Sequence, residues 1–246
     1  MKRILIMIVA CALSATGQSR PVTIFLAGDS TMAAKAPDKK PETGWGEMLE
    51  SRFKPGTVKV DNRAMNGRST TSFIAEGRWK ALIESVSKDD YVFIQFGHND
   101  QKKDKPGVYA PPEQYRANLA NFVKDVKEKG ANPVLLTSIA RRRYEGGKVV
   151  PTHGDYPGFV REVAEELNVP LIDLERASDM LLARVGEEGS KRIYLHLKPG
   201  ENPNYPKGIE DNTHLSTYGA GIIADLAIDA IRELRLRNLA KNIVYR

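Results

Sequence analysis

The chain has 246 residues, of which 41% are apolar and 28% are charged, and its formal net charge is +6. This composition is typical of a folded globular protein and excludes a disordered or an integral membrane chain. The length suits one large domain. Aromatic residues make up only 7% and are not interleaved with a basic stripe, so we expect no nucleic-acid partner. The positive charge favours an anionic substrate.

The first residues have the pattern of an export signal. The basic stretch MKR is followed by the apolar run ILIMIVACAL, which is too short to span a bilayer. Ala15 and Gly17 then offer a cleavage site, so residues 1–17 are predicted to be a signal peptide and residues 18–246 a single domain. Alternatively, IVAC is a lipoprotein box, with a lipid anchor on Cys11. Both readings predict an exported protein, periplasmic or extracellular, without a membrane span. A third reading of the same segment is an uncleaved anchor.

Strand-like and helix-like stretches alternate along the rest of the chain. Five apolar runs have the length of strands: VTIFLAG (22–28), TVKVDNRA (57–64), DYVFIQFG (90–97), NPVLLTSIA (132–140) and NVPLIDL (168–174). Helical spacing of apolar residues appears at 44–53, 72–87, 112–129, 156–167, 175–188 and 215–238. Segments 100–112 and 198–213 look irregular. The alternation predicts an α/β fold, a three-layer α/β/α sandwich around a five-stranded parallel sheet.

Residues suited to acyl transfer follow the predicted strands. In this fold class ligands bind beyond the carboxyl ends of the strands. Ser30 follows the first strand, Gly67 the second and Asn99 the third, while Asp211 and His214 precede the last helix. Acyl transfer needs a hydroxyl, an imidazole base, a carboxylate that orients the base, and donors for the oxyanion. Ser30, His214 and Asp211 fit the first three roles. The amides of Ser30 and Gly67 and the side chain of Asn99 fit the donors.

Each of these residues alone also has a structural explanation. A serine after a strand commonly caps a helix or forms a turn, and Asp211 could cap the last helix. Asn99 suits a turn, and His214 could pack against the apolar helix that follows it. Their order along the chain, at the ends of neighbouring strands, favours the catalytic interpretation.

Five motifs resemble those of a known family: GDSTMA, GWGEML, NGRST, FGHNDQ and DNTHLSTYGA. Together they are similar to the blocks of the SGNH (GDSL) hydrolases, and more narrowly to the rhamnogalacturonan acetylesterase branch. The resemblance implies a flavodoxin-like sheet, Ser30 as nucleophile, His214 as base and Asp211 as its partner. It also implies an oxyanion hole made of Ser30, Gly67 and Asn99, and no metal or organic cofactor.

The implied substrate is an acetyl ester on the galacturonate of pectic rhamnogalacturonan, cleaved through an acetyl-enzyme. We expect a monomer that acts on an acetylated, anionic polysaccharide or oligosaccharide. Asn66 stands where many relatives have a second glycine, which predicts a different loop shape but leaves the role of Gly67 in place.

Five further side chains are candidate substrate contacts. Arg142 and Arg143, after the fourth strand, would bind uronate carboxylates or else form a solvated basic loop. Trp45 would stack on a sugar or anchor its helix. His153 would line the cleft or lie in a surface loop, and Arg68, beside Gly67, is the fifth candidate. His98, next to Asn99, is expected to be structural.

Other functions stay open at this point. A lipid or thioester hydrolase on the same scaffold would need a wide apolar acyl pocket, whereas the predicted loops are polar, charged and rich in Pro and Gly. A non-catalytic sugar-binding protein would lack one of the catalytic residues, and none is missing. Acetylated xylan is an alternative to pectin as the substrate.

Overall fold

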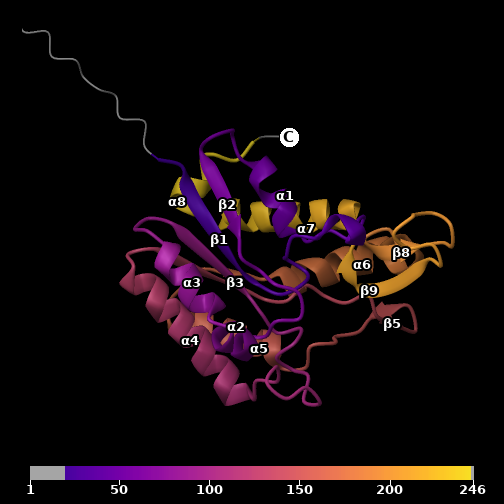
Figure 1. Cartoon of the computed structure of the whole chain (residues 1–246), viewed down its shortest axis with the longest axis horizontal. Helices are drawn as coiled ribbons and strands as arrows, with labels where there is room; N and C mark the ends of the chain where they lie inside the picture. The colour runs from indigo at the N-terminus through magenta and orange to yellow at the C-terminus, as the bar shows by residue number, and fades with distance from the viewer. Residues whose placement is uncertain (1–19, 245–246) are drawn as a thin grey trace, which may run out of the picture.

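Five parallel strands form the central sheet of the computed structural model, which describes residues 20–244. Their order across the sheet is β2-β1-β3-β4-β7 (Figure 1). They are β1 (Val22–Gly28), β2 (Val58–Asn62), β3 (Tyr91–Gln95), β4 (Asn132–Leu136) and β7 (Leu171–Ile172). This arrangement confirms the predicted fold class. The predicted signal peptide, residues 1–17 with Cys11, lies outside the described residues.

The strand order reverses beside β1. The chain passes from β1 to β2 on one side and then crosses to β3 on the other. Leu26 of β1 pairs with Asn62 of β2 and with Phe93 of β3, so the carboxyl ends of these strands lie together. Open α/β sheets bind ligands in the crevice at such a reversal.

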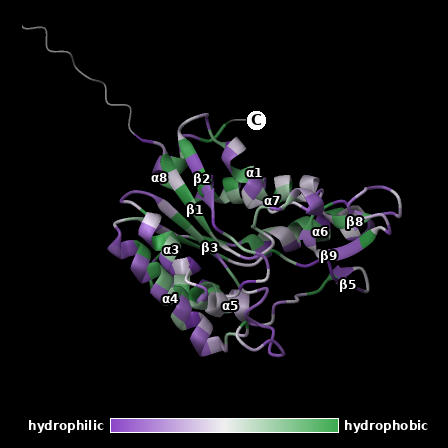
Figure 2. Cartoon of the chain, viewed as in Figure 1, coloured by the Kyte–Doolittle hydropathy of each residue, from purple (hydrophilic) through white to green (hydrophobic). Residues whose placement is uncertain are grey.

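Helices cover both faces of the sheet (Figure 1). On one face Ile24 and Leu26 pack with α1 (Gly46–Leu49), α6 (Leu174–Ser190) and α7 (Thr217–Glu233). On the other face Phe25 and Ala27 pack with α3 (Arg78–Ser85), α4 (Pro112–Glu128) and α5 (Tyr156–Glu166). Alternate residues of β1 thus serve two separate cores, as expected for a strand buried on both sides. Figure 2 shows the hydrophilic outer side of α4.

The expected helices are interrupted where the backbone turns. The predicted helix 72–87 is two helices, α2 (Thr70–Ala75) and α3, because Gly77 adopts a positive φ of 70° between them. The predicted helix 215–238 ends at Glu233, and a separate short helix, α8 (Arg237–Ala240), follows Arg235 at φ 50°. The predicted helix 44–53 becomes α1 and a 3-10 turn, Glu50–Arg52, and another 3-10 turn covers Pro37–Lys39.

Two antiparallel hairpins lie outside the main sheet. One joins β5 (Tyr144–Glu145) to β6 (Lys148–Val149), and the other joins β8 (Tyr194–Leu197) to β9 (Ile209–Leu215). The prediction that 198–213 is irregular is therefore wrong from residue 209 onwards. Only Leu215 of β9 is fully buried, so this strand lacks the apolar pattern that reveals a strand in a sequence.

None of the helices within residues 20–244 has the length and apolar character needed to cross a membrane.

Candidate active site

Ser30, His214 and Asp211 form one hydrogen-bonded line. His214 Nε2 lies 2.9 Å from Ser30 Oγ, and His214 Nδ1 lies 2.6 Å from Asp211 Oδ2. Ser30 follows β1, whereas Asp211 and His214 both belong to β9, so residues from opposite ends of the chain meet here. The His214 side chain is 29% exposed, and the line therefore opens to solvent at the imidazole.

The Asp211 carboxyl is held in its ionised form. Burial alone would raise its pKa, but hydrogen bonds from the His214 ring and backbone, together with one from the Thr213 N–H, hold the pKa well below its usual range. An ionised carboxylate beside Nδ1 favours the tautomer that carries its proton on that nitrogen. Nε2 is then free to accept the proton of the Ser30 hydroxyl, as a general base must.

The turn that presents Ser30 is built by the preceding aspartate. Asp29 is fully buried, and its Oδ1 accepts hydrogen bonds from both the N–H and the hydroxyl of Thr31, each at 2.9 Å. Its backbone oxygen accepts the N–H groups of Met32 and Ala33. Burial raises the pKa of the Asp29 carboxyl. The aspartate thus fixes the backbone on both sides of the serine.

The loops that carry Gly67 and Asn99 are joined to each other. Gly67 adopts a φ of +76° in the loop after β2, a conformation that favours glycine. Asn99, after β3, donates from Nδ2 to the Arg68 carbonyl at 3.0 Å and accepts from Lys102 Nζ at 2.7 Å. These contacts place the Asn99 N–H group on the side of the Gly67 loop.

A buried lysine joins the Ser30 loop to the Gly67 loop. Lys35 Nζ donates to the Ser30 carbonyl at 2.5 Å and to Asn66 Oδ1 at 2.9 Å, and it pairs with Glu42 at 2.8 Å. The Lys35 side chain is 1% exposed. Asn66, where we expected a departure in loop shape, supplies the side chain that this lysine needs. The loops after β1, β2 and β3 therefore form one connected frame that can present N–H groups to an oxyanion.

Comparison with known proteins assigns the fold and motifs to a family. Residues 26–222 match the GDSL-like lipase/acylhydrolase family. The chain belongs to this family. It is accordingly a carboxylic ester hydrolase, and the predicted resemblance to the GDSL enzymes is confirmed.

Two rhamnogalacturonan acetylesterases are similar in sequence to this hydrolase over most of its length. It is 44% identical to rhamnogalacturonan acetylesterase RhgT of Bacillus subtilis over 218 residues, which cover 88% of this chain and 92% of that one. It is 28% identical to a rhamnogalacturonan acetylesterase of Emericella nidulans over 229 residues, which cover 85% and 84% of the two chains.

Solved structures share the fold of the hydrolase. The crystal structure of protein YXIM from Bacillus subtilis superposes with a TM-score of 0.74 at 24% identity, covering 89% of this chain but 58% of that one. An acetylxylan esterase, Axe2 of Geobacillus stearothermophilus, superposes with a TM-score of 0.61 at 19% identity over 86% and 94% of the chains.

Trp45 of the hydrolase has no exposed surface on which a sugar could stack. Its side chain is fully buried in the core, and its Nε1 donates to Gln95 Oε1 at 3.0 Å. The suggestion that it stacks on a sugar is wrong, and the alternative, an anchor for the segment before α1, is the correct one. A buried indole commonly finds such a partner for its N–H.

Arg142 is also removed from the substrate-binding candidates. Its side chain is only 9% exposed, and it donates to Ser190 Oγ, Asn212 Oδ1 and the Glu187 carbonyl. The guanidinium therefore bonds to acceptors of the protein itself and does not face a substrate. Arg143 is exposed and pairs with Glu145 at 2.7 Å in the β5–β6 hairpin, so it stays a candidate.

Arg68 folds back onto its own surroundings but keeps an exposed face. Its Nε lies 3.0 Å from Glu76, and NH1 donates to the Asn66 carbonyl at 2.8 Å. With 31% of the side chain exposed, it also stays a candidate for contact with the substrate.

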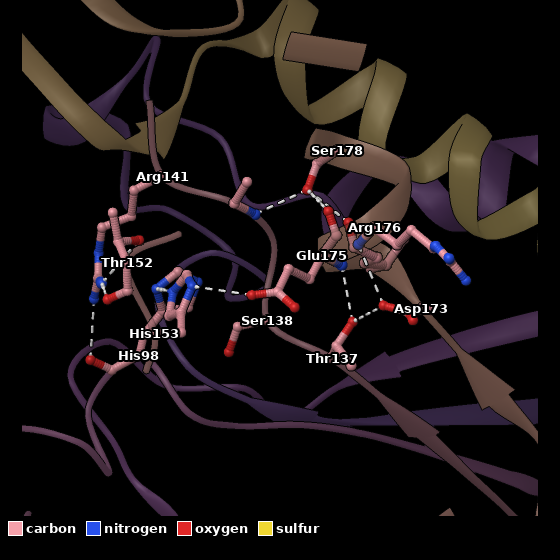
Figure 3. Close-up of polar contacts among 12 residues, drawn as sticks. His98, Thr137, Ser138, Arg141, Thr152, His153, Asp173, Glu175, Arg176 and Ser178 are labelled. Carbon is pink, nitrogen blue, oxygen red and sulfur yellow. Dashed lines mark hydrogen bonds and ion pairs between the residues drawn. The ribbon is translucent and has the colours of Figure 1, made fainter. Parts of the chain in front are cut away.

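His153 lies neither on a cleft wall nor on the surface. It is 1% exposed, and its Nε2 lies 2.9 Å from Nδ1 of His98 (Figure 3). Its Nδ1 lies 3.9 Å from Glu175. Burial lowers the pKa of His98 far below 6.5 and that of His153 to about 3, so both rings are neutral near pH 7. Both earlier interpretations of His153 are wrong, whereas His98 has the structural role expected of it.

Arg141 braces the same region. Its guanidinium donates to the Thr152 carbonyl at 3.1 Å and to the His98 carbonyl at 3.2 Å, joining the loop after β4 to the Asn99 loop (Figure 3).

The sequence shows no sign of what Lys35 and Lys102 do at the site, and it suggests only a turn for Asp100. Asp100 is fully buried and accepts from the N–H and hydroxyl of Thr70 at 2.8 and 2.6 Å and from the Gly97 N–H at 3.0 Å. Burial raises its pKa to about 7. It fastens the Asn99 loop to the start of α2. The motif GHND contains the residue, but only its burial reveals the role.

Proposed function

We propose that this enzyme is a serine esterase that removes acetyl groups from a plant cell-wall polysaccharide, namely pectic rhamnogalacturonan. The observation that carries the proposal is the hydrogen-bonded line from Ser30 through His214 to Asp211. The acetylated substrate is inferred from the relatives that are named rhamnogalacturonan acetylesterases.

In the proposed mechanism His214 Nε2 takes the proton of Ser30, and the serine oxygen attacks the acetyl carbonyl. The N–H groups of Ser30 and Gly67 and Asn99 Nδ2 stabilise the oxyanion. The sugar hydroxyl leaves with the proton from His214, and an acetyl ester remains on Ser30. Water, deprotonated by the same imidazole, then releases acetate. Asp211 stays ionised and stabilises the imidazolium that forms in both steps.

The substrate is tested by measuring acetate release from acetylated rhamnogalacturonan, acetylated homogalacturonan and acetylated xylan at equal acetyl content. We expect the largest kcat/KM on rhamnogalacturonan. A preference for xylan would keep the esterase mechanism and overturn the pectic substrate. Activity only on long-chain acyl esters would instead indicate the lipid hydrolase.

We further infer export of the enzyme from the N-terminal pattern of residues 1–17. A polymeric cell-wall substrate is met outside the cell, which agrees with such a signal. The mass of the mature protein distinguishes cleavage after Gly17 from a lipid-bearing N-terminus at Cys11.

A further inference from the structure

The Asn99 loop carries a lysine that holds the Asn99 side chain. Lys102 Nζ donates to Asn99 Oδ1 at 2.7 Å, while Asn99 Nδ2 donates to the Arg68 carbonyl at 3.0 Å. An ammonium can only donate, so it selects the oxygen end of the amide. The two contacts together determine which end of the amide faces the loop of Gly67.

The positive charge of Lys102 has no carboxylate partner within the described residues, in contrast to Lys35, which pairs with Glu42. Lys102 is partly buried, and the positive charges of Lys105 and Arg141 lie near it. Burial and these two cations lower the pKa of Lys102. Asp29 and Asp104 raise this pKa, but their effect is smaller. The fold thus keeps an uncompensated ammonium beside Asn99.

An ammonium on the oxygen of an amide strengthens the N–H groups of that amide as donors. Hydrogen bonds to charged groups are stronger than neutral ones, and bonds in a chain polarise each other. The chain here would run from Lys102 through the Asn99 amide to a substrate oxygen. Its benefit increases as negative charge develops on that oxygen, so it acts on the transition state more than on the bound ester.

We propose that Lys102 is a positioning residue that orients and polarises the Asn99 amide as a donor to the oxyanion. The inference rests on the esterase function proposed above for the same site. On this inference Lys102 affects kcat only by way of the Asn99 amide, and it does not contact the sugar.

The test is a double-mutant cycle assayed on a small neutral acetyl ester. We expect Lys102→Met to lower kcat about tenfold while KM changes less than about twofold. The loss in kcat should be smaller than the loss of about a hundredfold or more that follows removal of a whole oxyanion donor. In an Asn99→Ala background the same substitution should have almost no further effect, since the group through which it acts is gone. Lys103→Met, the same change on an exposed neighbour, should leave kcat unchanged.

Two conservative variants separate charge from geometry. Lys102→Arg should recover kcat to within about threefold of the wild type, while Lys102→Gln, a neutral donor, should fall between Arg and Met. Thermal unfolding of each variant shows whether it is folded. If Lys102→Met does not fold, the cycle is run with Lys102→Gln. The same pattern is expected, with a smaller decrease in kcat.

An equal loss of kcat in the wild type and in the Asn99→Ala background would overturn the inference, because Lys102 would then act independently of Asn99. A loss seen only on the acidic polymer would also overturn it, since that result would assign the lysine to uronate binding. These outcomes are distinct from failure of the esterase function, in which the wild-type enzyme and Ser30→Ala would hydrolyse the neutral ester equally.

Discussion

Arg142 holds the strand of the candidate active site from outside that site. Its backbone N–H donates to the Asn212 carbonyl at 2.8 Å, and its guanidinium donates to Asn212 Oδ1 at 3.2 Å. Asn212 lies between Asp211 and His214 along β9. The arginine therefore holds the strand that carries His214 and Asp211.

Replacing Arg142 by Ala should lower kcat by similar factors on a neutral acetyl ester and on the pectic polymer, because it loosens β9 and removes no substrate contact. The lost hydrogen bonds should also reduce the free energy of unfolding by about 1–3 kcal/mol. Kinetics on both substrates and denaturant unfolding measure these effects. Arg143→Ala, which removes only an exposed ion pair, serves as the stability control. A loss confined to the polymer would return Arg142 to the substrate-binding residues.

At the scale of elements, the start of α7 is packed against the backbone that leads into β8. A Cβ placed on Gly219 would lie 1.9 Å from the Ile193 carbonyl oxygen, and Ser216, the N-cap, donates its N–H to the same oxygen at 3.0 Å. His214 precedes this junction by only a few residues. The spacing between α7 and the β8–β9 hairpin thus influences where the imidazole lies.

Gly219→Ala should therefore lower both stability and kcat. The clash should cost about 1–3 kcal/mol, typical of overpacking, and a displacement of His214 by about 1 Å can cost on the order of a hundredfold in rate. Gly189→Ala in α6 is the matched control, because its Cβ would meet nothing closer than Val185 Cβ at 3.5 Å. Wild-type kinetics in Gly219→Ala would show that the close approach does not position the base.

The elements differed in how far the sequence could predict them. The central strands β1, β3 and β4 are predictable because both of their faces are buried and their residues are almost continuously apolar. The edge strand β2 is half-buried, and its signal is the alternation of Val58 and Val60 with polar residues. β9 was missed because most of its side chains face the site or solvent, as polar residues. Ser30, Gly67 and Asn99 can be proposed as site residues from the sequence because strand ends and turns leave local signals. Lys35 and Lys102 were missed because their contacts depend on how separate loops fold together, which no local pattern records.

For the whole molecule, the buried pair His98 and His153 predicts a loss of stability in acid. Both rings have pKa values lowered by burial, to about 3 for His153, against about 6.5 in an unfolded chain. As pH falls below about 6.5, both histidines bind protons in the unfolded chain but stay neutral in the folded protein. The free energy of unfolding therefore decreases. Each histidine contributes up to about 1.4 kcal/mol per pH unit. Asp100, whose pKa burial raises to about 7, contributes the opposite slope.

The pair can be isolated by comparing the wild type with His153→Gln, which keeps a polar partner for His98. Denaturant unfolding between pH 6 and pH 4 should show a shallower dependence on pH in the variant, by up to about 1.4 kcal/mol per pH unit. Parallel slopes in the two proteins would mean that His153 is not kept neutral by its burial.

The central claim is that Ser30 attacks an acetyl ester and carries the acetyl group. The direct measurement is acetate release from acetylated rhamnogalacturonan by the wild type and by Ser30→Ala, with intact-protein and peptide mass spectrometry of the rapidly quenched reaction. In the wild type we predict one acetyl group on the peptide that contains Ser30. In Ser30→Ala we predict neither that acetyl group nor significant acetate release. The variant should have the same thermal unfolding midpoint as the wild type. Ser85→Ala, at an exposed serine of α3, should behave as the wild type. Undiminished acetate release by a folded Ser30→Ala would contradict the account.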